Sequence, residues 1–117
     1  MNRQRESRRI KLSLSCNWGG TEDCPRSGTI TSLSLKGCFV QTKAAVVEGQ
    51  ALYMNCWLPS RRWFPLRGQI IYHLPRVGFG LMFTNLSEND SEMLNLLMDY
   101  YEGATWPGAQ AEENEVD

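Results

Sequence analysis

The chain of 117 residues has the length of one compact domain, with 42% hydrophobic and 21% charged residues, as is usual for a globular protein. No segment approaches the roughly 20 consecutive apolar residues of a membrane span, and the arginine-rich N-terminus lacks the apolar run of a secretory signal. We therefore expect a cytoplasmic protein. The net charge of −1 is unevenly divided, because residues 1–76 hold all 12 Lys and Arg and residues 77–117 hold nine of the 13 acids. This asymmetry indicates an anion-binding front half and an acidic tail.

In chain order, residues 1–9 have no apolar period and predict a flexible basic arm. Residues 10–18, "IKLSLSCNW", alternate apolar and polar side chains, which predicts a half-buried strand. Turn-forming residues fill positions 19–28. Further strands are predicted at 29–34, 37–42, 51–59, 64–74 and 77–86, the last two forming a hairpin around Pro75-Arg76.

The apolar period then changes to that of a helix. It predicts a helix over 88–102, capped by Ser87 or Asn89 and stopped by Gly103. Residues 103–117 are acidic and punctuated by Pro and Gly, which predicts a disordered tail. Six or seven short strands followed by one helix imply a small antiparallel barrel. Side chains fill the interior of such a barrel, so a ligand is expected on its outside.

The residues do not indicate an enzyme or a metal site. His73 is the sole histidine and has no evident nucleophile beside it, and no G-x-x-x-x-G-K phosphate loop is present. The four cysteines contain no C-x-x-C pair, so we predict no zinc site and no cofactor. Cys16, Cys38 and Cys56 lie in apolar strand-like segments and are expected to be buried, reduced thiols.

Two short motifs contain the candidate binding residues. The arm carries Arg5, Arg8 and Arg9, and a planar guanidinium can donate to two phosphate oxygens or stack on a purine. The segment "SLSLKG" places two serine hydroxyls on one side of a strand, next to a lysine and a glycine. Its candidate residues are Ser32, Ser34, Lys36 and Gly37. Each motif alone is also compatible with a solvated tail or an ordinary strand end.

Taken together, "RESRRIKL" and "SLSLKGCFV" resemble the R-x-x-x-R and D/N-x-S-x-x-G motifs of PilZ domains, which are bacterial receptors for cyclic di-GMP. The resemblance covers roughly residues 3–102 and includes the glycine-rich segment "VGFGLMF". It implies an all-β dominated fold, a six-stranded antiparallel β-barrel with one C-terminal α-helix, over residues 10–102. By position, Arg5 and Arg9 match the first motif, and Ser34 and Gly37 match the second.

The resemblance implies a cyclic di-GMP receptor or adaptor that signals by ordering its arm and changing a surface for a protein effector. Ser32 stands where the family usually has Asp or Asn. A hydroxyl accepts less well from a guanine edge, and loss of one good polar contact costs about 1–3 kcal/mol.

Two alternatives remain open at this point. One is a PilZ-like adaptor that binds no nucleotide and acts through protein contacts. The other is a small barrel that binds single-stranded nucleic acid, which the acidic rear half disfavours. This barrel would use the basic arm together with Trp57, Arg61, Arg62, Trp63 and Phe64 as stacking and phosphate-binding groups.

Overall fold

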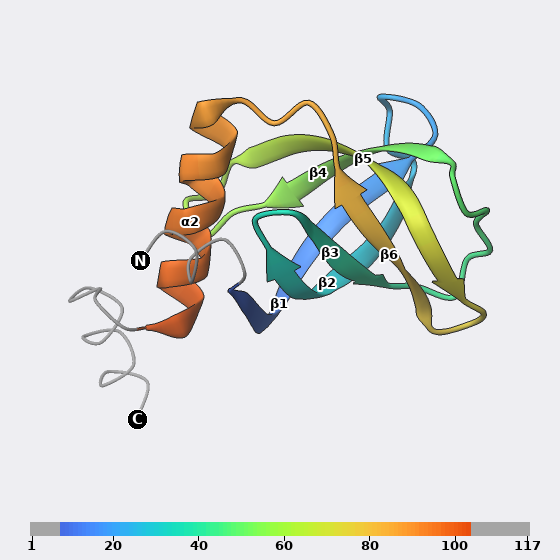
Figure 1. Cartoon of the computed structure of the whole chain (residues 1–117), viewed down its shortest axis with the longest axis horizontal. Helices are drawn as coiled ribbons and strands as arrows, with labels where there is room; N and C mark the ends of the chain where they lie inside the picture. Colours follow the sequence, from blue (N-terminus) through green and yellow to red (C-terminus); the bar gives the residue numbers. More distant parts are fainter. Residues whose placement is uncertain (1–7, 104–117) are drawn as a thin grey trace.

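The structure, a computed structural model, describes residues 8–103 as six strands and one helix (Figure 1). The predicted tail beyond Gly103 and the arm before Arg8 lie outside the described residues. The elements are β1 (Arg9–Gly19), β2 (Arg26–Ser34), β3 (Gly37–Gln41), β4 (Ala51–Trp57), β5 (Trp63–Leu74), β6 (Gly78–Phe83) and α2 (Glu88–Glu102).

The strand β1 closes the sheet into a barrel. It pairs antiparallel with β2, beginning with Arg9 opposite Ser34, and its second half also pairs with β4, with Cys16 opposite Cys56. The ring order is β1-β2-β3-β6-β5-β4, so each strand has a partner on both sides. This closed six-stranded antiparallel barrel with one C-terminal helix confirms the predicted fold class.

The alternation of apolar residues places one face of every strand inside the barrel. Trp18 of β1 meets Phe79 of β6 there edge to face, with ring centroids 5.0 Å apart. The thiols of Cys16, Cys38 and Cys56 are buried and free. Burial, with a smaller contribution from Cys24, raises the pKa of Cys16 to about 12, so this thiol remains protonated at neutral pH.

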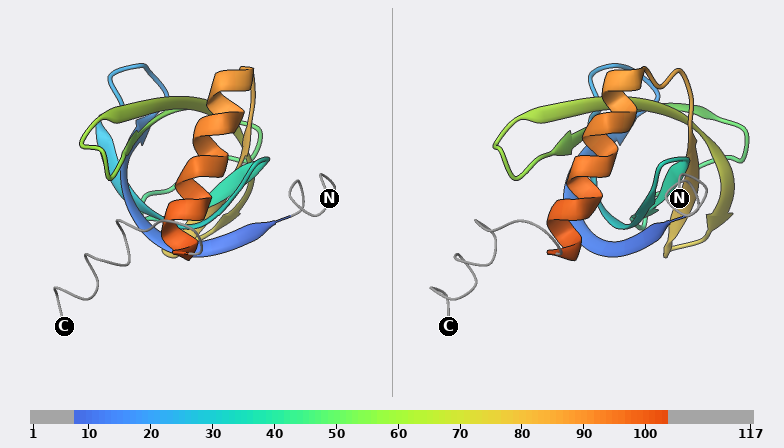
Figure 2. Two further views of the ribbon diagram at one scale, coloured as in Figure 1. Left: turned by 90° about the vertical axis from the view of Figure 1, so that its left-hand side faces the viewer. Right: turned by 60° about the vertical axis from the view of Figure 1, so that its left-hand side comes forward.

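The helix α2 lies across one open end of the barrel (Figure 2). It buries Leu94, Leu97 and Met98 against the core. Ser87 caps it through a reciprocal pair of hydrogen bonds with Asp90, and Gly103 ends it in a left-handed conformation with φ 67°. Within residues 8–103, α2 is too short and too polar to cross a membrane.

Candidate ligand-binding site

The two sequence motifs meet where β1 begins and β2 ends. Antiparallel pairing sets Arg9 opposite Ser34 and Lys11 opposite Ser32. The Arg9 guanidinium uses both terminal nitrogens here: Nη1 donates to Ser32 Oγ at 2.8 Å and Nη2 donates to Ser34 Oγ at 3.5 Å. Arg9 therefore forms one polar cluster on the outside of the barrel with two serines that lie 23 and 25 positions further along the sequence.

Ser34 is the buried member of this cluster and builds the turn between β2 and β3. Its Oγ accepts hydrogen bonds from the backbone N–H groups of Lys36 at 3.1 Å and Gly37 at 3.2 Å, and donates to the Gly37 carbonyl at 3.3 Å. The side chain is 5% exposed, so these bonds compensate for its desolvation. Ser34 thus positions the turn, whereas the half-buried Ser32 presents its hydroxyl at the surface.

Gly37 is required because β3 and β6 approach very closely at this point. A Cβ at position 37 would lie 2.1 Å from the carbonyl oxygen of Leu81. The preceding residue, Lys36, accepts a backbone hydrogen bond from Phe83 N–H at 2.8 Å, which ties the turn to β6. The Lys36 side chain is exposed. Its ammonium is therefore accessible beside the turn.

Arg8 is placed differently from Arg9. Arg8 faces α2, where Nη1 lies 3.0 Å from Asp99 Oδ1 and 2.9 Å from Glu102 Oε1. Its Nη2 also donates to Asn95 Oδ1 at 3.4 Å. Arg5 lies outside the described residues. Of the predicted binding residues, the structure brings together Arg9, Ser32, Ser34, Lys36 and Gly37. It places the Arg8 side chain against α2 instead.

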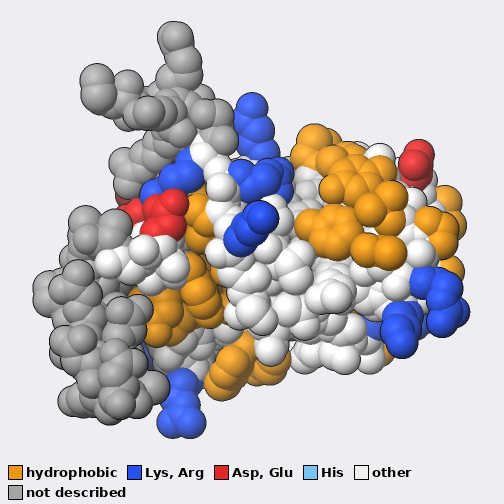
Figure 3. Space-filling model, turned by 90° about the horizontal axis from the view of Figure 1, so that it is seen from below, with side chains coloured by type: hydrophobic (Ala, Val, Ile, Leu, Met, Phe, Trp, Pro, Cys, Tyr) orange, Lys and Arg blue, Asp and Glu red, His pale blue; other side chains and the backbone are white. Residues whose placement is uncertain are grey.

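A wide pocket of about 810 Å³ opens beside Arg9 and Ser32. It includes four residues that the sequence did not single out, Lys11, Thr31, Phe39 and Tyr72. Figure 3 shows hydrophobic side chains gathered next to Lys and Arg side chains on this face. Lys11 could have been identified from the polar side of the first alternating strand. The two aromatic residues gave no such signal, because aromatic residues in a small barrel usually belong to the core.

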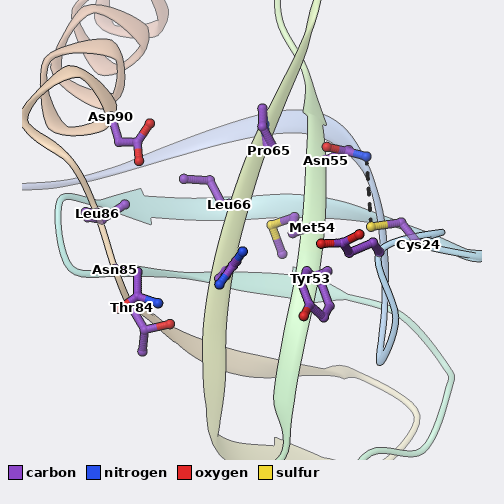
Figure 4. A pocket seen from close by; sticks show the side chains of 12 residues that line it. Cys24, Tyr53, Met54, Asn55, Pro65, Leu66, Thr84, Asn85, Leu86 and Asp90 are labelled. Carbon is purple, nitrogen blue, oxygen red and sulfur yellow. Dashed lines mark hydrogen bonds between the residues drawn. The ribbon is translucent and has the colours of Figure 1, made fainter.

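A second pocket, of about 520 Å³, crosses the outer faces of β4 and β5 (Figure 4). Cys24 lies at one side, where its Sγ accepts a hydrogen bond from Asn55 Nδ2 at 3.9 Å, and Thr84 and Asn85 lie at the other side (Figure 4). The Arg67 guanidinium is 5.4 Å from the centre of the Tyr53 ring. This pocket contains none of the predicted ligand residues.

The described residues offer little for metal binding or nucleophilic catalysis. Between residues 8 and 103, no three His, Cys, Asp or Glu side chains gather as a metal site would require. Burial is the main cause that raises the pKa of the Cys24, Cys38 and Cys56 thiols, and a protonated thiol is a poor nucleophile and ligand. The pocket beside Arg9 is instead lined by cations, hydroxyls and aromatic rings, and its cations suit recognition of an anion.

The family comparison and one solved structure name the same family. The chain matches the PilZ domain family over residues 3–100. The solved PilZ domain of CeSA from a cellulose-synthesising bacterium is 17% identical with a TM-score of 0.62, covering 83% of this chain and 97% of that one. The inhibitor of motility MotI/DgrA of Bacillus subtilis is 13% identical with a TM-score of 0.60, covering 83% of this chain and 50% of that one.

An uncharacterised Legionella protein is also similar, with 17% identity, a TM-score of 0.55, and coverage of 82% of this chain and 95% of that one. A comparison with curated proteins gave no match. At these identities the similarity to the solved structures establishes the fold.

Proposed function

Because the chain belongs to the PilZ domain family, we propose that it binds cyclic di-GMP at the cluster formed by Arg9, Ser32 and the β2–β3 turn. The observation that carries this proposal is the set of partners that the Arg9 guanidinium contacts. Its guanidinium is exposed and bonded to two neutral hydroxyls, and within residues 8–103 no carboxylate lies within ion-pair distance of it. A phosphate is a stronger acceptor than a hydroxyl, so it would replace these bonds favourably.

The ligand has two phosphates and two guanines, and each part finds a matching group. Arg9 would donate to a phosphate or to the O6 and N7 edge of a guanine. Ser32 and the exposed Lys36 would add a hydroxyl and an ammonium beside it. Ser34 and Gly37 would hold the turn in the shape that this contact needs.

The proposed signal is ordering of the arm over the bound ligand. Arg5, the other arginine of the family motif, belongs to the arm and would add a second guanidinium to the bound ligand. Arg8 could join it only by releasing its contacts with Asp99 and Glu102 on α2. Binding would thereby change the surface between the arm and the helix, which a protein effector could recognise.

A second candidate function is an adaptor that binds no nucleotide. Ser32 favours it, because the family usually has a carboxylate or an amide at this position. Ser32 has one hydroxyl to offer, and that oxygen already accepts from Arg9. In this case the same face of the barrel would serve protein contacts alone.

Isothermal titration calorimetry tests the proposal directly. Cyclic di-GMP is titrated into the full chain, with GMP and a single-stranded oligonucleotide as matched controls. Saturable heat with cyclic di-GMP, absent or much weaker with GMP and the oligonucleotide, supports the receptor function. Absence of binding by the folded chain would instead support the adaptor.

A further inference from the structure

Two aromatic side chains lie side by side on the outer face of the barrel, directly next to the proposed site. Phe39 of β3 and Tyr72 of β5 both sit opposite Gly80 of β6, one on each side of it. Their ring centroids are 6.1 Å apart and the ring planes differ by 28°, so the rings are nearly parallel. We call this pair, Phe39 and Tyr72, the aromatic platform.

Glycines of β6 make the aromatic platform possible. A Cβ at position 80 would come within 2.3 Å of the Tyr72 ring, and a Cβ at position 78 would come within 2.7 Å of the Phe39 ring. The rings therefore cover the outward positions of the two glycines, where any other residue would displace them. The segment "VGFGLMF" thus has two roles. Its inward-facing residues fill the core, and its glycines leave room for the aromatic platform on the outer face.

A β-bulge explains why Tyr72 is outside the barrel at all. Ile70 pairs with Leu81 and faces the core, whereas the register shifts before Tyr72 pairs with Gly80. Regular alternation from the buried Ile70 would have turned residue 72 inward. The bulge leaves both Ile71 and Tyr72 outside, with exposed fractions of 51% and 42%.

The aromatic platform shares one pocket with two cations and two hydroxyls. Besides Phe39 and Tyr72, this pocket is lined by Arg9, Lys11, Thr31 and Ser32. Lys11 is exposed, and within residues 8–103 no carboxylate lies within ion-pair distance of it. A flat apolar surface beside two cations that have no carboxylate partner among residues 8–103 matches a nucleotide, which joins a flat base to a phosphate. A protein partner would require no such pairing of an aromatic face with unpaired cations.

We propose that the aromatic platform stacks a purine base of the ligand while Lys11 contacts the adjoining phosphate. This inference rests on the proposed function and extends it to residues outside the two family motifs. The platform would hold one guanine by its face, and Arg9 with Ser32 would hold polar edges of the same ligand. Stacking does not depend on the Ser32 hydroxyl, so it would offset part of the affinity lost through the departure from Asp or Asn at that position.

Three variants test the stacking by calorimetry with cyclic di-GMP. Tyr72→Leu keeps a bulky apolar side chain over Gly80 but removes the ring, and we expect binding to weaken about five- to hundred-fold, the range found for loss of base–aromatic stacking. Tyr72→Phe retains the ring and should bind within about two-fold of the parent. Ile71→Ala is the matched control, because Ile71 is the exposed neighbour that does not line the pocket, and it should also bind like the parent.

A spectroscopic measurement separates stacking from a structural effect. When a base lies over an aromatic ring, the ring current should move its H8 proton signal upfield in the bound state, and Tyr72→Leu should abolish this shift. Thermal unfolding of each variant checks that the barrel is intact, and Phe39→Leu provides a second test if Tyr72→Leu is unstable. If the parent binds cyclic di-GMP and the stable ring-deletion variants bind equally well, the aromatic platform is not part of the site and the proposed function still stands. If the parent does not bind, both fail.

Lys11→Gln tests the phosphate contact. Loss of one phosphate contact should weaken binding about three- to ten-fold and reduce its dependence on salt. Lys43→Gln is the matched control, since Lys43 is also exposed but does not line the pocket. Equal salt dependence for the parent and for Lys11→Gln would remove Lys11 from the proposed site.

Discussion

Arg8 and Arg9 are neighbours in the chain, but the structure places them in two different regions. Arg8 lies against the last turns of α2 and has two carboxylates within 3.0 Å. Arg9 lies on the barrel and contacts the hydroxyls of Ser32 and Ser34. Successive residues at the start of a strand point in opposite directions, which accounts for the difference. Adjacent arginines in a basic arm are therefore not equivalent ligand donors, because one can be committed to the fold.

The electrostatic surroundings of the two arginines differ in the same way. Arg8 is neutralised by Asp99 and Glu102, so a phosphate would have to compete with two carboxylates for it. Arg9 is exposed and would gain its first anionic partner from the ligand. This comparison predicts that changes at Arg9 and Ser32 act mainly on ligand affinity, and that changes at Arg8 act mainly on the docking of α2.

The largest effect is expected from Gly37→Ala, which disrupts the turn beneath Arg9 and leaves Arg8 untouched. The new Cβ would meet the Leu81 carbonyl oxygen at 2.1 Å, and a paired backbone has little freedom to yield. The free energy of unfolding should fall by about 3 kcal/mol, and binding of cyclic di-GMP should be lost with the turn. Chemical denaturation and calorimetry measure both effects. Gly20→Ala is the control, because its Cβ would find the nearest atom, Gln50 Nε2, at 3.7 Å. Parent-like stability of Gly37→Ala would contradict the close approach of β3 and β6.

Arg9→Ala should weaken ligand binding strongly with little change in stability. Truncation of a charged hydrogen-bonding group costs about 1.5–3 kcal/mol, or roughly ten- to 150-fold in affinity. The barrel should stay folded, because Arg9 is exposed and Ser34 keeps its backbone partners in the turn. Arg62→Ala, at an exposed arginine of the β4–β5 loop, controls for loss of one positive charge. Unchanged affinity of Arg9→Ala would exclude the Arg9 cluster as the ligand site.

Ser32→Asp should tighten the binding of cyclic di-GMP at the Arg9 cluster. A carboxylate accepts from guanine donors more strongly than a hydroxyl, so cyclic di-GMP binding should tighten by about 1–2 kcal/mol before its desolvation cost. Arg9 Nη1 already lies 2.8 Å from Ser32 Oγ and would offset repulsion between the new charge and the ligand phosphates. Parallel calorimetric titrations of the parent and the variant at one salt concentration measure the gain. Ser32→Ala is the matched control and should bind no better than the parent. Weaker binding by Ser32→Asp would mean that the hydroxyl already suits the bound ligand.

The sequence predicted the barrel from its short alternating strands followed by one helix. It singled out Ser34 as a ligand-binding candidate and did not predict that Ser34 builds the turn. It did not predict the partner of Arg8, since Arg8 and Asp99 are 91 positions apart and nothing in the local pattern links them. It also missed Tyr72 as a surface residue. A β-bulge at Ile71 sets the direction of that side chain, and bulges depend on the pairing of two strands rather than on one apolar period.

Arg8→Ala should have the smallest effect and should act on stability. Asp99 and Glu102 lie at the C-terminal end of α2, where the helix dipole disfavours negative charge and where the last turn contains no basic residue. Arg8 supplies the missing cation, but its side chain and those of its partners are 23%, 34% and 38% exposed, so solvent screens the pairs. We expect the free energy of unfolding to fall by about 0.5–1 kcal/mol, and the loss should shrink in high salt.

A double-mutant cycle that combines Arg8→Ala with Asp99→Asn isolates the contribution of the Arg8–Asp99 pair to stability. The affinity of Arg8→Ala for cyclic di-GMP then decides what Arg8 does in the bound state. If Arg8 only anchors α2, the affinity should change by less than about three-fold, which is small beside the loss in Arg9→Ala. A loss as large as that in Arg9→Ala would show that Arg8 leaves Asp99 and Glu102 to reach the ligand. The two arginines would then act together, and release of α2 by Arg8 would itself be part of the signal.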